Sequence, residues 1–77
     1  MMKRIDRAIV EDLREAFPVG CRVRLVRMND PFRPDLKEGE LGTVRAVDSI
    51  GTIHVSWDCG SSLGVVYGED MCVRVGT

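Results

Sequence analysis

The fold is decided by the stretch from Gly39 to Gly60, which reads Gly-Glu-Leu-Gly-Thr-Val-Arg-Ala-Val-Asp-Ser-Ile-Gly-Thr-Ile-His-Val-Ser-Trp-Asp-Cys-Gly. Residues 42–48 and 52–57 are rich in β-branched side chains and are bounded by glycines, which predicts two β-strands. Residues 49–51 and 58–60 each end in glycine and are typical of tight turns. We therefore expect two consecutive strands, each followed by a tight turn.

The second of these strands has an inner and an outer face. Successive side chains of a β-strand point to opposite sides. Ile53, Val55 and Trp57 therefore share one face, which we expect to lie in the core, while His54 and Ser56 share the exposed face.

Before this stretch, residues 3–16 predict an amphipathic helix. The apolar residues Ile5, Ile9 and Leu13 recur every four positions, and Ala8 and Ala16 flank the same face. Pro18 ends the helix, because proline has no N–H to donate and restricts the residue before it. We divide the chain into a helical segment, 1–17, and a β segment, 18–77.

A single helix of about 14 residues is marginally stable in water, so its apolar stripe must pack against something. We expect it to cover one open end of a small barrel formed by its own chain. The alternative is that the stripe contacts a second copy of the chain in a homodimer, or binds another partner.

The first strand is expected between Cys21 and Met28. Cys21, Val23 and Leu25 alternate with Arg22 and Arg24, which predicts a half-buried strand with arginines on its outer face. The apolar–polar alternation changes near Val26, which indicates a bulge.

Residues 29–41 have no period and contain turn-forming residues, so we expect a long loop, with Phe32 between two prolines. Loops of this length in small domains are often functional. Further short strands are expected at 63–66 and 71–75, with a turn at 67–70. The predicted fold class is mainly β, a small SH3-like barrel of about five strands with one N-terminal helix, because closure leaves few open edges.

Composition restricts the classes of function. The net charge is −1, with seven basic against four acidic residues in 1–27, and four against eight in 28–77. No apolar run approaches the roughly 18 residues that cross a bilayer. Lys3 and Arg4 are not followed by the apolar segment of a secretory signal, so we expect a cytoplasmic protein that does not bind membranes. The three cysteines lack Cys-x-x-Cys spacing, and we expect reduced thiols with no metal and no cofactor.

Several motifs together resemble a known family. They are Pro18 to Pro31, Gly39-Glu-Leu-Gly-Thr-Val, Val47-Asp48, Gly51 to Asp58, Gly60-Ser-Ser-Leu and Tyr67-Gly-Glu-Asp70. Over residues 18–75, with the helix outside the match, the chain resembles the bacterial family catalogued as domain of unknown function 4314. The Gly-x-x-Gly-Thr-Val hairpin is also similar to SH3-like barrels of the KOW type, found in ribosomal and transcription proteins. The resemblance implies an SH3-like fold and implies no activity.

The chain departs from the family pattern at two turns. Cys59 stands where the family has asparagine, which tolerates left-handed backbone angles better than cysteine does. We therefore expect a changed or less stable turn there. Ser49 stands where the family often has a second aspartate after Asp48, which argues against an acidic metal-binding pair.

The sequence shows no arrangement typical of catalysis. A nucleophile needs a positioned base, and the single histidine, His54, is expected on an exposed strand face. No carboxylate pair, phosphate-binding glycine loop or metal-ligand cluster has a diagnostic spacing. We expect a protein that is not an enzyme.

Two binding functions remain open. The first is an uncharacterised binding module for an unknown protein or peptide partner, with Phe32 and Tyr67 as candidate contacts, because SH3-type barrels present aromatic residues to extended segments. The alternative is binding of RNA or DNA through Arg22, Arg24 and Arg45, whose guanidinium groups can pair with phosphates. The acidic pI of about 5.7 favours the first over the second.

Overall fold

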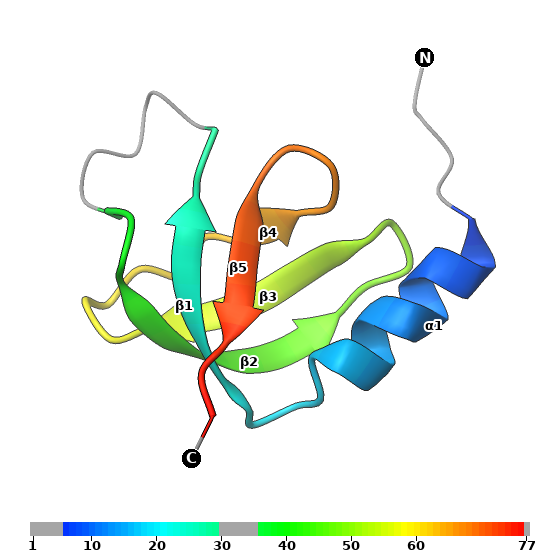
Figure 1. Ribbon diagram of the computed structural model, residues 1–77, viewed down its shortest axis with the longest axis horizontal. Helices are drawn as coiled ribbons and strands as arrows, with labels where there is room; N and C mark the ends of the chain where they lie inside the picture. The colour runs from blue at the N-terminus through cyan, green and yellow to red at the C-terminus, as the bar shows by residue number, and fades with distance from the viewer. Residues whose placement is uncertain (1–5, 30–35, 77) are drawn as a thin grey trace.

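The computed structural model describes residues 6–29 and 36–76. They form, in chain order, α1 (Arg7–Ala16), β1 (Arg22–Arg27), β2 (Leu41–Val47), β3 (Thr52–Trp57), β4 (Val65–Val66) and β5 (Met71–Arg74). The strands make one antiparallel sheet in the order β4-β3-β2-β1-β5 (Figure 1). The sheet curls so that β4 and β5 come into contact, although no ladder pairs them within the described residues. The predicted mainly β fold with five strands and one helix is confirmed, and the curled sheet is consistent with an SH3-like barrel.

The inner face of the sheet carries the core. Ile53, Val55 and Trp57 are all buried, as strand alternation predicts, and His54 and Ser56 are exposed. The Trp57 indole Nε1–H donates to the carbonyl of Leu63 at 2.8 Å, which satisfies its polar atom inside the core. β1 and β2 complete the same core, through Val23, Leu25, Val44 and Val47.

The strands β1 and β2 each contain a bulge that interrupts pairing with a neighbouring strand. The β1–β5 register shifts between Leu25 and Arg27, which confirms the bulge predicted near Val26. The β2–β3 register shifts between Val44 and Ala46, so Arg45 occupies a second bulge that the sequence pattern did not indicate.

The predicted loop 29–41 is shorter than expected at its C-terminal end. Leu41 is the first residue of β2, and Gly39 and Glu40 already bond to Leu25 of β1, with N···O distances of 2.7 and 2.8 Å. Leu36 is buried in the core. The loop prediction was therefore wrong only at Leu41, since residues 36–40 are turn and irregular structure. Phe32 lies outside the described residues.

The helix within the described residues begins at Arg7, where Asp6 caps it by accepting from the Ala8 N–H at 2.8 Å. Its buried face also differs from the prediction: Val10 is buried, Leu13 and Phe17 pack against the core, and Ala8 and Ala16 are exposed. The residues that touch the sheet recur at spacings of three and four, as expected for one face of a helix.

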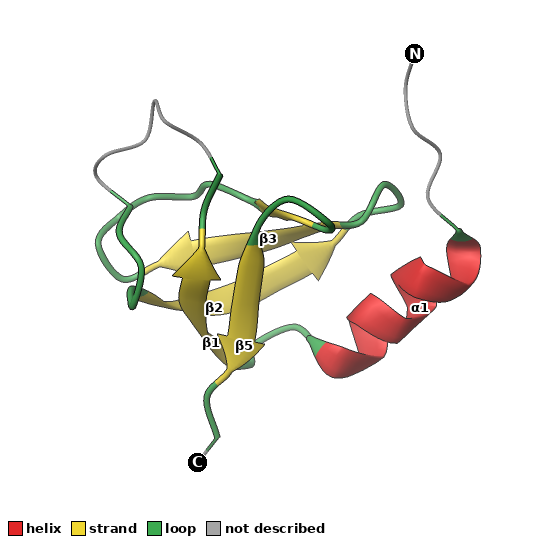
Figure 2. Cartoon of the chain, turned by 45° about the horizontal axis from the view of Figure 1, so that its top comes forward, coloured by secondary structure: helices red, strands yellow, loops and turns green. Residues whose placement is uncertain are grey.

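The helix packs on its own sheet, beside β2 (Figure 2). Arg14 Nε donates to the carbonyl of Val47 at the end of β2, at 3.1 Å. This contact agrees with the expectation that the helix covers its own barrel, and a homodimer through the helix stays a prediction. No helix in the described part of the chain is long and apolar enough to cross a membrane.

The turn at 57–60 avoids the strain that the sequence suggested for Cys59. The Gly60 N–H donates to the Trp57 carbonyl at 2.9 Å, and Gly60, not Cys59, takes the left-handed conformation, with φ of 100°. Among the described residues, none other than glycine has positive φ. The left-handed position falls one residue after Cys59, so Cys59 itself adopts no unfavourable backbone angle, and a less stable turn than that of the family stays a prediction.

Gly42 is the residue that a side chain would disturb most in this core. A Cβ at this position would lie 2.5 Å from Cγ1 of Val55 and 2.8 Å from Cε3 of Trp57. We expect Gly42→Ala to lower the free energy of unfolding by roughly 1–3 kcal/mol, through overpacking, and to lower the urea midpoint. Gly76→Ala is the matched control, because its added Cβ would meet no atom within 4 Å. Equal midpoints for the two variants would contradict the packing described here.

Candidate functional site

An apolar cleft of about 300 Å³ lies between α1 and the β4–β5 end of the sheet. We call it the α1–β5 cleft, after two of the elements that line it. Its lining residues are Leu13 and Phe17 from the helix, Ile53, Val65 and Cys72 from the sheet, and Arg27, Tyr67, Gly68, Asp70 and Met71. The cleft exists because α1 packs against β2, while β4 has only two residues to cover the core on the opposite side.

Two exposed apolar side chains mark the cleft lining. Tyr67 is 51% exposed and Met71 is 48% exposed. Tyr67 directly follows β4 and Met71 begins β5, and both line the cleft together with the buried residues Ile53 and Val65. Large apolar side chains that stay exposed next to a pocket are typical of a binding surface.

The turn that presents Tyr67 is held by one carboxylate. Asp70 Oδ2 accepts from the Val66 N–H at 2.9 Å, and Asp70 Oδ1 accepts from the Asn29 N–H at 2.8 Å. The Glu69 and Asp70 N–H groups in turn donate to the Val66 carbonyl at 3.0 and 2.9 Å. These bonds fix the backbone on both sides of Tyr67, so its side chain is carried by an ordered turn.

The cleft lining carries a cation. Arg27 contributes to it and makes no ion pair with any carboxylate of the described residues. The carboxylate of Asp70, which also lines the cleft, already accepts two backbone hydrogen bonds. The lining therefore includes one basic and one acidic side chain, Arg27 and Asp70.

The thiol in the cleft belongs to the buried residue Cys72. Burial of Cys72, and to a smaller extent the neighbouring Cys21, raises the pKa of the Cys72 thiol to about 11. At neutral pH the thiol stays protonated, whereas the thiolate is the nucleophile. His54, the candidate base, is hydrogen-bonded to Asp48 on the exposed face of β3 and does not line the cleft.

The structure does not bring the three predicted arginines together as a free basic surface. Arg22 donates to both carboxylate oxygens of Asp58, at 2.9 and 2.6 Å, and to Thr43 Oγ1 at 3.0 Å. The hydrogen bond with Asp58 raises the pKa of Arg22 and lowers that of Asp58. Arg24 and Arg45 are exposed on the neighbouring strands β1 and β2. The sequence concealed the Arg22–Asp58 pair because 36 positions separate its members.

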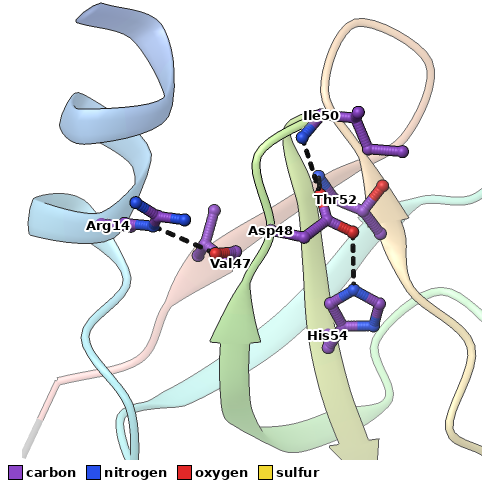
Figure 3. A network of polar contacts seen from close by, with 6 residues as sticks. All are labelled: Arg14, Val47, Asp48, Ile50, Thr52 and His54. Carbon is purple, nitrogen blue, oxygen red and sulfur yellow. Dashed lines mark hydrogen bonds and ion pairs between the residues drawn. The ribbon is translucent and has the colours of Figure 1, made fainter. Parts of the chain in front are cut away.

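A second polar cluster organises the β2–β3 hairpin (Figure 3). Asp48 Oδ1 accepts from the backbone N–H groups of Ile50 and Thr52, at 3.1 and 2.9 Å, while Oδ2 lies 2.8 Å from Nε2 of His54. The cluster adjoins Val47, where Arg14 attaches the helix. Within residues 6–29 and 36–76, no group of His, Cys, Asp and Glu is arranged to hold a metal ion. Asp48 is therefore best explained as a structural carboxylate.

Tyr67 is the predicted site residue that the structure places at the cleft. Sequence reasoning missed Arg27 and Met71 as contacts, because the pattern assigned them only to strands. The sequence did offer a signal for Leu13 and Phe17 as neighbours in the cleft, because they are four residues apart on one helix face.

The low reactivity of Cys72 can be measured by alkylation. We expect iodoacetamide at pH 8 to modify Cys72 in the folded chain about 100-fold more slowly than a thiol of reference pKa, because the thiolate fraction is smaller. Exposed Cys59 serves as the internal control. Mass spectrometry of timed samples, repeated in denaturant, checks this. Rapid modification of Cys72 in the folded chain would contradict the burial described.

The Asp48 cluster should make the free energy of unfolding depend on pH. Desolvation raises the pKa of Asp48, but its hydrogen bonds with Thr52, His54 and Ile50 outweigh this and leave the pKa below the usual value. The resulting stabilisation is present above the unfolded-state pKa and is lost as the pH falls through the lower folded-state pKa.

We expect Asp48→Ala to lower the free energy of unfolding at pH 7 by roughly 1 kcal/mol, because two backbone N–H groups lose their acceptor and both are close to solvent. Asp48→Asn should cost less, since an amide oxygen still accepts from both. Urea unfolding at several pH values should show the wild-type advantage over Asp48→Asn shrinking below about pH 4. An advantage that grows on acidification would refute the assignment.

Comparison with known proteins places the chain in a family. The model of the domain of unknown function DUF4314 matches residues 6–75. The match begins at the helix cap, so the helix belongs to the family pattern, which the sequence analysis had limited to 18–75. No curated protein matches the sequence. Because the match covers the whole of α1 and the whole sheet, this chain belongs to the DUF4314 family.

Proposed function

We propose that this chain is a non-catalytic binding module, whose α1–β5 cleft receives apolar side chains from a segment of a partner protein. The observation that carries the proposal is an apolar cleft flanked by two half-exposed side chains, Tyr67 and Met71. In a small domain with a well-packed core, such residues favour a protein contact.

The size of the cleft supports a peptide segment as its ligand. About 300 Å³ is at the lower limit of small-molecule sites, which span roughly 300–1,000 Å³. That volume suits one or two side chains of a longer segment. Tyrosine and methionine are both enriched at protein interfaces, where they bury large areas.

The absence of catalysis is part of the proposal. The Cys72 thiol is held protonated by burial, and His54 is paired with Asp48 outside the cleft. A reaction would need a nucleophile with a base in hydrogen-bonding reach. Three unpaired cysteines fit the reducing interior of a bacterial cell, so we also propose a cytoplasmic location.

Nucleic-acid binding through the arginines of β1 and β2 stays a prediction. The pairing of Arg22 with Asp58 reduces its support, because that guanidinium already has a carboxylate partner. Arg24 and Arg45 alone offer two charges, and phosphate binding strengthens with the number of phosphates neutralised.

Selection from a displayed library of random twelve-residue peptides tests the proposal. We expect an enriched peptide whose affinity falls at least about tenfold with Tyr67→Ala and with Met71→Ala, because truncated aromatic and apolar contacts often cost that much. Ile50→Ala is the matched control: Ile50 is 59% exposed and does not line the cleft. Thermal melts of all variants check that each is folded.

Failure of any peptide to be enriched, or equal loss of affinity in the Ile50 control, would refute the proposal. Binding of labelled single-stranded RNA at low salt that is lost in an Arg24→Ala, Arg45→Ala double variant would instead support the nucleic-acid prediction.

A further inference from the structure

The sheet has two edge strands, and they differ in whether their backbone groups are satisfied. β4 and β5 stand at the ends of the strand order. An edge strand presents unpaired N–H and C=O groups that can pair with another chain, unless the protein covers them. The state of each edge therefore determines where an added strand would bind.

The edge of β4 is closed by its own following turn. The outward N–H of Val66 donates to Asp70 Oδ2 at 2.9 Å, and the Val66 carbonyl accepts from the N–H groups of Glu69 and Asp70. The Tyr67 N–H is directed to the other side, where it donates to the Gly51 carbonyl at 3.1 Å. These bonds leave β4 no free pair of groups for another strand.

The edge of β5 is open. The N–H and C=O of Leu25 both bond to the β2 side, to Glu40 and Gly39. Cys72 is directly opposite Leu25, so this is a pair without mutual hydrogen bonds, and the N–H and C=O of Cys72 point away from β1. The Val75 N–H donates to the Arg22 carbonyl at 2.9 Å, so the backbone groups of Val75 face β1 and those of the preceding residue, Arg74, face away from it. Cys72 and Arg74 therefore present their backbone groups at the free edge.

This open edge runs along the α1–β5 cleft. Cys72 lines the cleft, and Leu13 and Phe17 of the helix line it as well. Side chains of a strand alternate between two faces. A strand paired with Cys72 and Arg74 would direct every second side chain into the apolar cleft.

The charges near the edge are of both signs. Arg27 lies opposite Met71 at the beginning of β5, and Arg74 ends the strand. Asp70 immediately precedes β5, and the exposed Glu69 lies in the Tyr67 turn. Arg74 is two residues from Cys72 and shares its face, so a strand whose apolar side chains face the cleft directs its other side chains away from Arg74. The partner is therefore defined by its extended backbone and its apolar positions.

We propose that the partner segment binds as an extended strand added to the free edge of β5, with apolar side chains at alternate positions directed into the α1–β5 cleft. This inference rests on the proposed function and specifies the conformation and the apolar pattern of the partner. Only two residues of β5 offer outward groups, so the paired region is short.

Proline at position 74 isolates the backbone contribution. It removes the outward N–H, while the Val73 and Val75 groups that pair with β1 are kept, and proline is tolerated on edge strands. Arg74→Ala is the matched control, because it removes the same charge and keeps the N–H. Thermal melts verify that both variants fold.

The probe is a blocked nonapeptide of alternating glutamate and valine, titrated into the isotopically labelled full chain and followed by NMR. We expect slowed hydrogen exchange of the Cys72 amide, and an affinity about threefold to tenfold lower for Arg74→Pro than for Arg74→Ala, which corresponds to one lost hydrogen bond. A peptide N-methylated at alternate residues should bind more weakly.

The outcomes separate the two proposals. Suppose that the NMR resonances of cleft residues shift equally with the N-methylated and the unmodified peptide, and that Arg74→Pro and Arg74→Ala bind with equal affinity. This result would overturn strand addition and leave cleft binding intact. No shift at the cleft with these peptides or with a library-selected peptide would overturn both. A free chain that sediments as a dimer, with the Cys72 amide protected without peptide, would assign the edge to a second copy and overturn the proposal.

Discussion

The contact between β2 and β3 at Gly42 is the constraint on which the rest of the structure depends. Gly42 is directly opposite Trp57, and its missing side chain leaves the room that the indole and Val55 occupy. With Trp57 turned inward and bonded to Leu63, the segment that returns to β4 is drawn across the core. The indole fills the inside of the curled sheet, in which β4 approaches β5.

Local patterns were sufficient for the elements and for the inner face of the sheet. The alternation from Thr52 to Trp57 predicted burial correctly, because each residue's environment depends on its own strand. Predictions failed where distant segments decide the outcome. Glu40 pairs with Leu25, and Arg22 is neutralised by Asp58, and neither partner is visible from neighbouring residues. The buried face of the helix is centred nearer to Val10 than the sequence pattern predicts. The way in which α1 packs against β2, and not periodicity alone, determines which of its residues are covered.

The candidate site was predictable only in part for the same reason. Tyr67 could be named from the sequence as one of few aromatic residues. Its partners at the cleft come from the helix, from β3 to β5 and from the bulged end of β1, which the fold alone brings together. The open edge of β5 is even harder to predict from the sequence. It depends on which backbone groups of β1 face β2, and thus on the register of three strands at once.

Asp70 joins two parts of the molecule that are far apart in the chain. One oxygen holds the turn at Tyr67, and the other holds Asn29, where the chain leaves β1. A ligand that shifts this turn must therefore strain or break the bond to Asn29. Through this single carboxylate, the turn at the cleft and the end of β1 at Asn29 are held in a fixed relation to each other.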